Sequence, residues 1–285
     1  MTAFMLAAAL VFAPADAQAA YKAAKSLVDE CTPRDAGTPQ AMRAARHILD
    51  AVSSTGADAR IDRFQAKTPK GPRWFANVES EYVSNRDAGW IVLVSHYDTK
   101  PGTGCPGAND GASTSGLLVA LAGVLFDQRP RGVNVLMIWT DGEECMSGYG
   151  EDDGLWGSRH AAERLKASGR KVTGVVCLDM LGDRDLKVTI PRNASPGFRR
   201  GVLKLAKAIG LGDKVAASEE LVKDDHVPFL SAGFKAIDLI DFEYGGAPGA
   251  NDYWHTPQDT MDKVSEESLL VAGRLAVAII DGLVE

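Results

Sequence analysis

Two adjacent acids, Glu143 and Glu144, follow an almost wholly apolar run at residues 133–139. The run has the length and the β-branched content of a strand, so it predicts a buried strand of a parallel sheet. In such sheets, ligands and chemistry gather beyond the carboxyl ends of the strands. Two carboxylates at that point could divide the work, one holding a metal ion and the other moving a proton. The alternative is a solvated turn, because Asp141-Gly142 is itself a turn signal.

Other acids and histidines also stand directly after apolar runs or at the start of predicted helices. They are His96, Asp98, Asp110, Asp179, Asp224, Asp225, His226, Asp241 and His255. Gathered at one edge of a sheet, so many acids would repel and desolvate one another unless a cation neutralised them. Oxygen and imidazole ligands without cysteine favour zinc in an open, catalytic site over a closed structural one. The sequence therefore predicts a metal centre, whereas His47 and His160, in predicted helices, are interpreted as structural.

The pattern of apolar residues supplies the strands and helices that must bring these side chains together. Strands are predicted at residues 76–80, 91–94, 133–139, 174–178 and 236–240, and helices at 38–52, 113–126, 160–167, 196–209 and 265–280. This alternation indicates an α/β fold, with a mixed, mostly parallel central sheet flanked by helices on both faces. A single domain is expected, because no repeat, low-complexity tract or linker divides the chain.

Composition and charge exclude several classes of function. The chain has 285 residues, of which 45% are hydrophobic and 24% charged, and its net charge of −7 makes nucleic acid an unsuitable partner. Between residues 16 and 285 no apolar stretch is long enough to cross a bilayer. Cys31, Cys105, Cys145 and Cys177 form no metal-binding pattern, and their pairing in disulfides is left open.

The N-terminus has the pattern of an export signal. Residues 1–12 are mainly apolar, and small residues frame two candidate cleavage points, at residues 15–17 and 17–19. We therefore expect residues 1–19 to be a signal peptide, residues 20–285 to be the catalytic domain, and the protein to be secreted or periplasmic. Basic residues are lacking in front of the apolar core, so the alternatives are an upstream start or an unprocessed helical tail, and the protein would be cytoplasmic if this segment is not a signal peptide.

The order of the candidate residues resembles the zinc-dependent aminopeptidase family, whose relatives include the animal-type glutaminyl-peptide cyclotransferases. The motif is formed by His96-x-Asp98, Gly107-Ala108-Asn109-Asp110, Glu143-Glu144, Asp179, Asp225-His226 and His255. Stretches that resemble the cyclotransferases in particular are residues 68–77, 95–100, 141–144, 157–160, 224–230 and 254–256. The resemblance spans residues 20–280, nearly the whole expected catalytic domain, and implies its α/β fold.

Three features favour the cyclotransferases over the aminopeptidases. Residues 145–156 separate the acid pair from the following Gly-Ser turn, as in the longer cyclotransferase loop. Asp224 stands where the aminopeptidases commonly have serine, and Trp254 beside His255 resembles a wall of the cyclotransferase pocket. The resemblance thus implies conversion of the N-terminal glutamine of peptides or proteins to pyroglutamate, with release of ammonia. The alternative is a zinc aminopeptidase that hydrolyses N-terminal residues.

The resemblance also implies a role for each candidate residue. The zinc ligands would be Asp110, Glu144 and His255. Glu143 would carry the proton, and Asp179 and Asp224 would form a hydrogen-bonded acid network beside it. His96 and Asp98 are open between a second metal site and a supporting role, because the residues matching His96 and Asp179 hold a second metal in two-zinc aminopeptidases. One zinc ion is expected, and two are left open.

The pocket walls differ from those of the relatives in one respect. Trp254 and Tyr149 would line the substrate pocket, but the cyclotransferases have tryptophan at the position of Tyr149.

Ser95 and Ser115 stand where the animal enzymes carry a disulfide, so that brace is absent. A binding protein that keeps this fold without the activity would be expected to have lost metal ligands or the proton carrier, and here they are all present.

Overall fold

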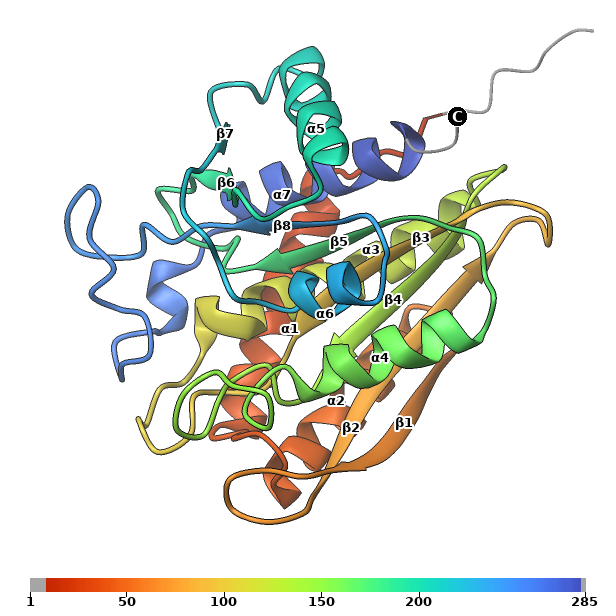
Figure 1. Ribbon diagram of the computed structural model, residues 1–285. Coiled ribbons are helices and arrows are strands. Elements are labelled where there is room, and N and C mark those ends of the chain that lie inside the picture. Colours follow the sequence, from red (N-terminus) through yellow and green to blue (C-terminus); the bar gives the residue numbers. More distant parts are fainter. Residues whose placement is uncertain (1–8, 283–285) are drawn as a thin grey trace, which may run out of the picture.

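A twisted sheet of eight strands forms the centre of the computed structural model, which describes residues 9–282 (Figure 1). The strands are β1 (Ala59–Ala66), β2 (Arg73–Val83), β3 (Trp90–His96), β4 (Asn134–Thr140), β5 (Val172–Asp179), β6 (Val188–Ile190), β7 (Val215–Ala217) and β8 (Ala236–Ile240). The helices are α1 (Pro14–Cys31), α2 (Pro39–Ser54), α3 (Thr114–Gln128), α4 (Trp156–Ala167), α5 (Pro196–Ala208), α6 (His226–Ser231) and α7 (Glu266–Gly282). Two short turns of helix are η1 (Ala108–Ser113) and η2 (Met261–Lys263).

The sheet is mixed, and its centre is parallel. Strands lie in the order β1-β2-β4-β3-β5-β8-β6-β7. The neighbours β4, β3, β5 and β8 run parallel, whereas β1 and β2 add to one side in antiparallel fashion and β6 pairs antiparallel with β8. Because His96 pairs with Thr140 and Asp179 with Ile240, the carboxyl ends of the four central strands reach the same edge. The predicted α/β fold is confirmed.

Helices cover both faces of the central strands, which explains why β3 and β4 are buried along their whole length. Successive residues of a strand point to opposite faces. Accordingly, Ile91 and Leu93 of β3 pack into the core under α1, α2, α3 and α7, while Val92 and Val94 pack into the core under α4 and α6. Figure 1 shows α4 and α6 in front of the sheet and α1 and α3 behind it. The continuous apolar runs are thus the mark of strands enclosed between two helical layers.

All five predicted strands and five predicted helices are present, with shifted ends. The pattern of apolar residues does not indicate β1, whose residues are mostly only partly buried, nor β6 and β7, which have three residues each. Helix α1 begins at Pro14, so both candidate cleavage points lie in its first turns, where Ala17 is buried. Residues 1–8 of the expected signal peptide lie outside the described part of the chain.

Two further expectations concern the pairing of the cysteines and segments that could cross a membrane. Cys31, Cys105, Cys145 and Cys177 are all buried free thiols. In place of the missing brace, the Ser95 hydroxyl donates to Thr114 Oγ1 at 2.9 Å. Within residues 9–282, none of the helices combines the length and the hydropathy needed to cross a membrane.

Candidate active site

The turn between β3 and α3 carries Asp110 to the edge of the sheet where the central strands end. Its backbone leaves helical geometry at Asp110 (φ −83°, ψ 91°) and at Gly111 (φ 88°). A Cβ atom at Gly111 would lie only 2.8 Å from Cε1 of His96, so only glycine allows this close approach. The distortion of the turn therefore brings the Asp110 carboxylate against the end of β3.

Asp110, Glu144 and His255 converge as the resemblance implies for a metal site. The His255 Nε2 atom lies 2.7 Å from Glu144 Oε1 and 3.3 Å from Asp110 Oδ2. One ligand atom from each residue lies within 4.8 Å of the other two. Asp110 Oδ2 and both Glu144 carboxylate oxygens are buried without a hydrogen bond of regular geometry. Two buried carboxylates and an imidazole that converge in this way fit zinc in an open site.

A second group of ligand atoms shares Asp110 with the first. His96 Nε2 lies 3.1 Å from Asp110 Oδ1 and 3.1 Å from Asp179 Oδ1. Asp98 is not part of either group, because its carboxylate accepts the backbone amides of Glu143 at 3.1 Å and Glu144 at 3.2 Å. The geometry thus gives Asp98 a supporting contact to the acid pair, whereas His96 and Asp179 could ligate a metal beside Asp110.

Glu143 lies next to this group and is shielded from solvent. Its side chain is buried, and the Tyr149 hydroxyl donates to its Oε1 and Oε2 atoms at 2.9 and 3.0 Å. Burial raises the pKa of the Glu143 carboxyl well above its usual range, and the negative charges of Glu144 and Asp224 add to the rise. A carboxylate with a raised pKa is suited to accepting and returning a proton near neutral pH.

Further buried acids lie behind Glu143. Burial raises the pKa of Asp179 to about 6, and burial together with the Asp179 charge raises that of Asp224 to about 7. Asp225, whose pKa burial also raises to about 7, accepts the Thr140 hydroxyl at 2.5 Å. Asp238 of β8 is fully buried, and neither of its carboxylate oxygens has a hydrogen bond of regular geometry. Asp225 and Asp238 are thus buried alongside Asp224, and the hydrogen-bonded network of Asp179 and Asp224 stays a prediction.

Two further candidates, His226 and Asp241, lie apart from this group. His226 Nε2 faces the Asn193 side-chain amide at 3.0 Å, and burial lowers the His226 pKa to about 4. Asp241 accepts the backbone amides of Lys187 at 2.8 Å and Glu243 at 3.0 Å. His226 and Asp241 therefore hold the local chain path and lie outside both groups of candidate ligand atoms.

The two histidines assigned to helices have structural contacts. His47 Nε2 lies 3.1 Å from the Ser26 hydroxyl, and His160 Nε2 lies 2.9 Å from Asp62 Oδ2. The His160 ring also stacks on Phe64, with centroids 4.1 Å apart. Neither histidine belongs to either group of ligand atoms.

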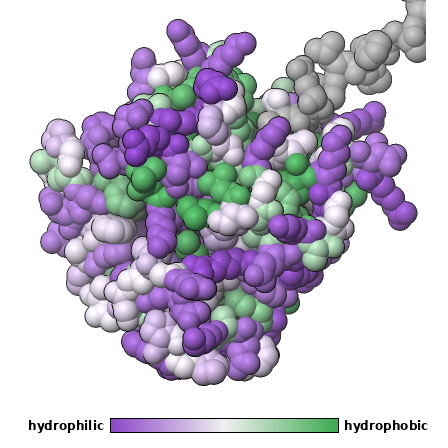
Figure 2. Space-filling model, in the orientation of Figure 1, coloured by the Kyte–Doolittle hydropathy of each residue, from purple (hydrophilic) through white to green (hydrophobic). Residues whose placement is uncertain are grey.

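A cavity of about 460 Å³ opens beside the acids and His255. Trp254 lines it and stacks on His255 with ring centroids 3.8 Å apart, and Phe242 lies 5.2 Å from Trp254. Tyr149 lines the cavity too, and the exposed Leu221 adds apolar surface. On the face of the molecule drawn in Figure 1, apolar side chains gather in a broken band across the middle (Figure 2). The cavity thus offers aromatic and apolar walls next to ionisable groups.

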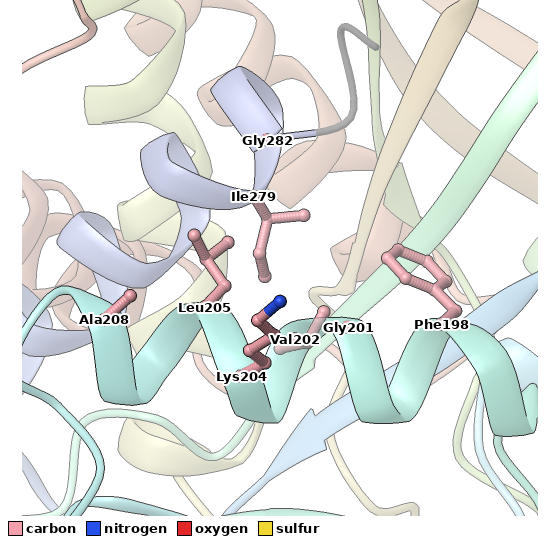
Figure 3. A pocket seen from close by; sticks show the side chains of 8 residues that line it. All are labelled: Phe198, Gly201, Val202, Lys204, Leu205, Ala208, Ile279 and Gly282. Carbon is pink, nitrogen blue, oxygen red and sulfur yellow. The ribbon is translucent and has the colours of Figure 1, made fainter.

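Another hollow, of about 280 Å³, lies between α5 and α7 (Figure 3). Phe198, Leu205 and Ile279 line it, and the amine of Lys204 is the one charged group in its lining. Unlike the first cavity, it has no acids or histidines among the described residues of its lining, and so no aromatic residues beside ionisable acids. The chemistry of the described residues is therefore concentrated at the strand ends.

Two residues that the sequence did not single out fix the backbone around Asp110. Fully buried Arg34 donates to the backbone oxygens of Tyr97, Pro106 and Gly107 at 2.5, 2.7 and 2.6 Å, which ties the loop before Asp110 to the end of β3. Arg34 binds backbone atoms that are distant from it in the sequence, so no motif marks it.

The second of these residues, Asp259, fixes the turn itself. Its carboxylate accepts the backbone amides of Asn109 at 2.7 Å and Asp110 at 3.2 Å, and it also accepts the Tyr244 hydroxyl at 2.6 Å. Asp259 is fully buried. Only the fold shows that its carboxylate faces the turn.

The chain is similar to known proteins named glutaminyl-peptide cyclotransferase or glutaminyl cyclase. Glutaminyl-peptide cyclotransferase of Drosophila melanogaster is 26% identical over 276 residues, covering 85% of this chain and 76% of that protein. The solved glutaminyl cyclase of an Acidobacteriales bacterium has 31% identity and a TM-score of 0.87, over 99% of this chain and 98% of that one. The glutaminyl cyclase of Porphyromonas gingivalis has 27% identity and a TM-score of 0.82, over 93% and 97% of the two chains.

These similarities confirm the relationship to glutaminyl-peptide cyclotransferases that the sequence motifs indicate. They do not single out the animal type, because the similar proteins include both animal and bacterial ones. Residues 77–280, more than half of the chain, match the family described as Peptidase family M28. The chain therefore belongs to peptidase family M28.

Proposed function

We propose that the protein is a zinc-dependent glutaminyl-peptide cyclotransferase that converts N-terminal glutamine of peptides or proteins to pyroglutamate and releases ammonia. One observation carries the proposal: buried Glu143, with its raised pKa, lies in an aromatic-walled cavity beside the carboxylates of Asp110 and Glu144, which converge with His255. Such a site can move a proton next to a polarised carbonyl group. The similarity to proteins named glutaminyl-peptide cyclotransferase supports the choice of reaction.

One zinc ion would be held by Asp110, Glu144 and His255. When bound there, it would polarise the γ-carbonyl of the substrate glutamine as a Lewis acid. The Lys100 amine lies 3.3 Å from Glu144 Oε2 and would balance part of the acid charge around the ion. His96, Asp110 and Asp179 could together hold a second ion. The zinc content of the purified protein therefore tests independently whether one ion is bound or two.

Glu143 would carry the proton through the reaction. The α-amine nitrogen of the substrate forms a bond to its own side-chain amide carbon, and the bond from that carbon to the amide nitrogen breaks. Glu143 takes the proton that the amine loses and returns it to the leaving nitrogen, which departs as ammonia. Asp179 and Asp224, with pKa values raised to about 6 and about 7, would share protons with their neighbours and limit the negative charge around Glu143.

The cavity walls would fold the substrate and exclude water. Since the nucleophile belongs to the substrate itself, the enzyme gains mainly by fixing a conformer in which the amine faces the amide carbon. Trp254 and Tyr149 line the cavity close to the acids, and Phe242 packs near Trp254. Removing water at this point also suppresses hydrolysis of the amide, which would give glutamate in place of pyroglutamate.

Hydrolysis of the first peptide bond is the second candidate function, because the chain belongs to a peptidase family. In that case the same Glu143 would deprotonate a water molecule. Incubating zinc-loaded protein with a peptide that begins with glutamine decides between them by mass spectrometry. We expect loss of ammonia alone; loss of a whole residue would establish the aminopeptidase instead, and an unchanged peptide would exclude both.

We also propose that residues 1–19 are a signal peptide and that the mature protein is secreted or periplasmic. The support is the apolar N-terminal run and its small residues at 15–19. N-terminal sequencing of protein from cell fractions tests this. A chain that starts within or just after residues 15–19 is expected in the exported fraction, whereas an intact Met1 on cytoplasmic protein would contradict the proposal.

A further inference from the structure

The loop between β4 and α4 places a tyrosine hydroxyl against the proposed proton carrier. Tyr149 Oη lies 2.9 Å from Oε1 and 3.0 Å from Oε2 of Glu143. A phenol has one proton to donate, so the two carboxylate oxygens share it. Within residues 9–282, Tyr149 supplies the hydrogen bonds that the Glu143 side chain accepts.

The loop that carries Tyr149 is pinned at both ends. The buried Asp153 carboxylate accepts the backbone amides of Met146, Ser147 and Gly148 at 2.6, 2.8 and 3.0 Å. At the end of the loop, the Leu155 amide donates to the backbone oxygen of Glu143 at 3.0 Å. The loop therefore returns onto the acid pair itself, and its shape is set by hydrogen bonds other than the one from the Tyr149 hydroxyl.

The Tyr149 ring is also held on several sides. At Gly154 (φ 80°), a Cβ atom would lie 2.7 Å from Cδ1 of the ring, so glycine is needed there for the ring to fit. The Lys100 amine lies 5.4 Å from the ring centroid. The Lys223 amine lies 5.9 Å from the centroid and donates to the Tyr149 backbone oxygen at 3.0 Å. These contacts involve the ring and backbone alone, so they would survive loss of the hydroxyl.

We infer that Tyr149 is a positioning residue for Glu143, and that its hydroxyl keeps the carboxylate turned toward the substrate amine. The inference rests on the proposed function and adds to it a residue that acts through the proton carrier. A carboxylate without this contact is free to rotate about its terminal bond, and the fraction of time in which it faces the amine falls. When one oxygen of Glu143 takes the proton, the other keeps its contact with Tyr149, so the orientation lasts through the transfer.

Tyr149→Phe removes the hydroxyl and leaves the ring in place. In the zinc-loaded full-length protein, we expect kcat for a glutamine-initiated peptide to fall about tenfold, part of the 10²–10⁴ that a positioned acid–base group supplies. KM and zinc content should stay unchanged, because the pocket wall and the ligand atoms are intact. Tyr82→Phe is the matched control: it loses a comparable bond, 2.8 Å to the Pro130 backbone oxygen, far from the site, and should keep full activity.

Crystal structures of the zinc-loaded wild type and Tyr149→Phe give a readout that needs no turnover. The Glu143 carboxylate is expected to rotate or become less ordered in the variant while the ring stays in place. An unmoved, equally ordered Glu143, or a variant with the kcat of the wild type, would overturn the inference. A wild type that does not release ammonia would instead refute the proposed function, and the comparison of the two structures would still decide the role of Tyr149.

Discussion

The Asp98 carboxylate accepts the backbone amide of Glu144, with 3.2 Å between Oδ2 and N. Its other oxygen accepts the amide of Glu143 at 3.1 Å. Asp98 follows β3 and the acid pair follows β4, and these strands are parallel neighbours. One fully buried carboxylate therefore spans the two strand ends and holds the backbone of both acids, while the Glu143 side chain contacts Tyr149 and the Glu144 side chain contacts His255.

Asp98→Asn should weaken this contact without changing the size of the side chain. Asparagine has one acceptor oxygen, so its NH₂ group would face one of the two backbone amides, donor against donor. Leaving a buried donor unsatisfied costs about 1–3 kcal/mol, so the free energy of unfolding in urea should fall by that amount. The exposed Asp87→Asn serves as the control and should be neutral. Equal stability of both variants would show that Asp98 does not hold the acid pair.

The two acids of the pair should respond differently to the same change. Glu143→Gln removes the proton acceptor, so turnover should fall by at least about 10²-fold while the zinc content stays at the wild-type level. Glu144→Gln removes a proposed ligand, so zinc content measured by atomic absorption should fall together with activity. Loss of zinc in Glu143→Gln, or its full retention in Glu144→Gln, would contradict the division of roles.

Activity should rise with pH between about 6 and 8. The substrate amine must be neutral to attack, and its pKa is about 7.7–8.0. Glu143 must be ionised to accept a proton, and its raised pKa moves that requirement toward neutral pH as well. Both groups thus lower the rate on the acidic side. A flat kcat/KM profile over this range, with chemistry rate-limiting, would count against attack by the substrate amine.

Much of the fold could be predicted because its central strands are enclosed. Strands β3 and β4 are buried on both faces and therefore appear in the sequence as unbroken apolar runs. Strand β1 is different: it pairs only with β2, and polar residues such as Arg60 and Asp62 remain partly exposed along it. Its sequence has no pattern that separates it from a surface loop. Burial on both faces, more than strand propensity, decides what the sequence reveals.

The site was predictable to the extent that its residues follow strands. Glu143, Glu144 and Asp179 lie at strand ends that the parallel register brings to one edge. Arg34 and Asp259 could not be recognised in the same way, because their partners are backbone atoms whose positions exist only in the folded chain. Side chains that perform chemistry leave a pattern of residue types, whereas side chains that shape the backbone around them do not.

Buried His226 should make the protein less stable in mild acid. Burial lowers its pKa to about 4, whereas the imidazole of the unfolded chain titrates near 6.5. Between these pH values His226 is protonated in the unfolded chain but neutral in the folded chain. His226 therefore lowers the free energy of unfolding by up to about 3 kcal/mol as pH falls from 6.5 to 4, and it lowers it no further below pH 4. Asp224 and Asp225, with pKa values raised to about 7, act in the opposite direction over this range, because their protonated forms are favoured in the fold.

Comparison with His226→Gln isolates the histidine from these acids. Glutamine keeps an acceptor for the Asn193 amide but does not titrate. The free energy of unfolding of each protein is measured in urea at several pH values. Relative to the variant, the wild type should be about 3 kcal/mol less stable at pH 4 than it is at pH 7. Because Asp238 Oδ2 lies 3.9 Å from His226 Nδ1, an ionised Asp238 would stabilise the protonated imidazole and shrink this change. Parallel stability curves for the two proteins would show that His226 does not stay neutral in the fold.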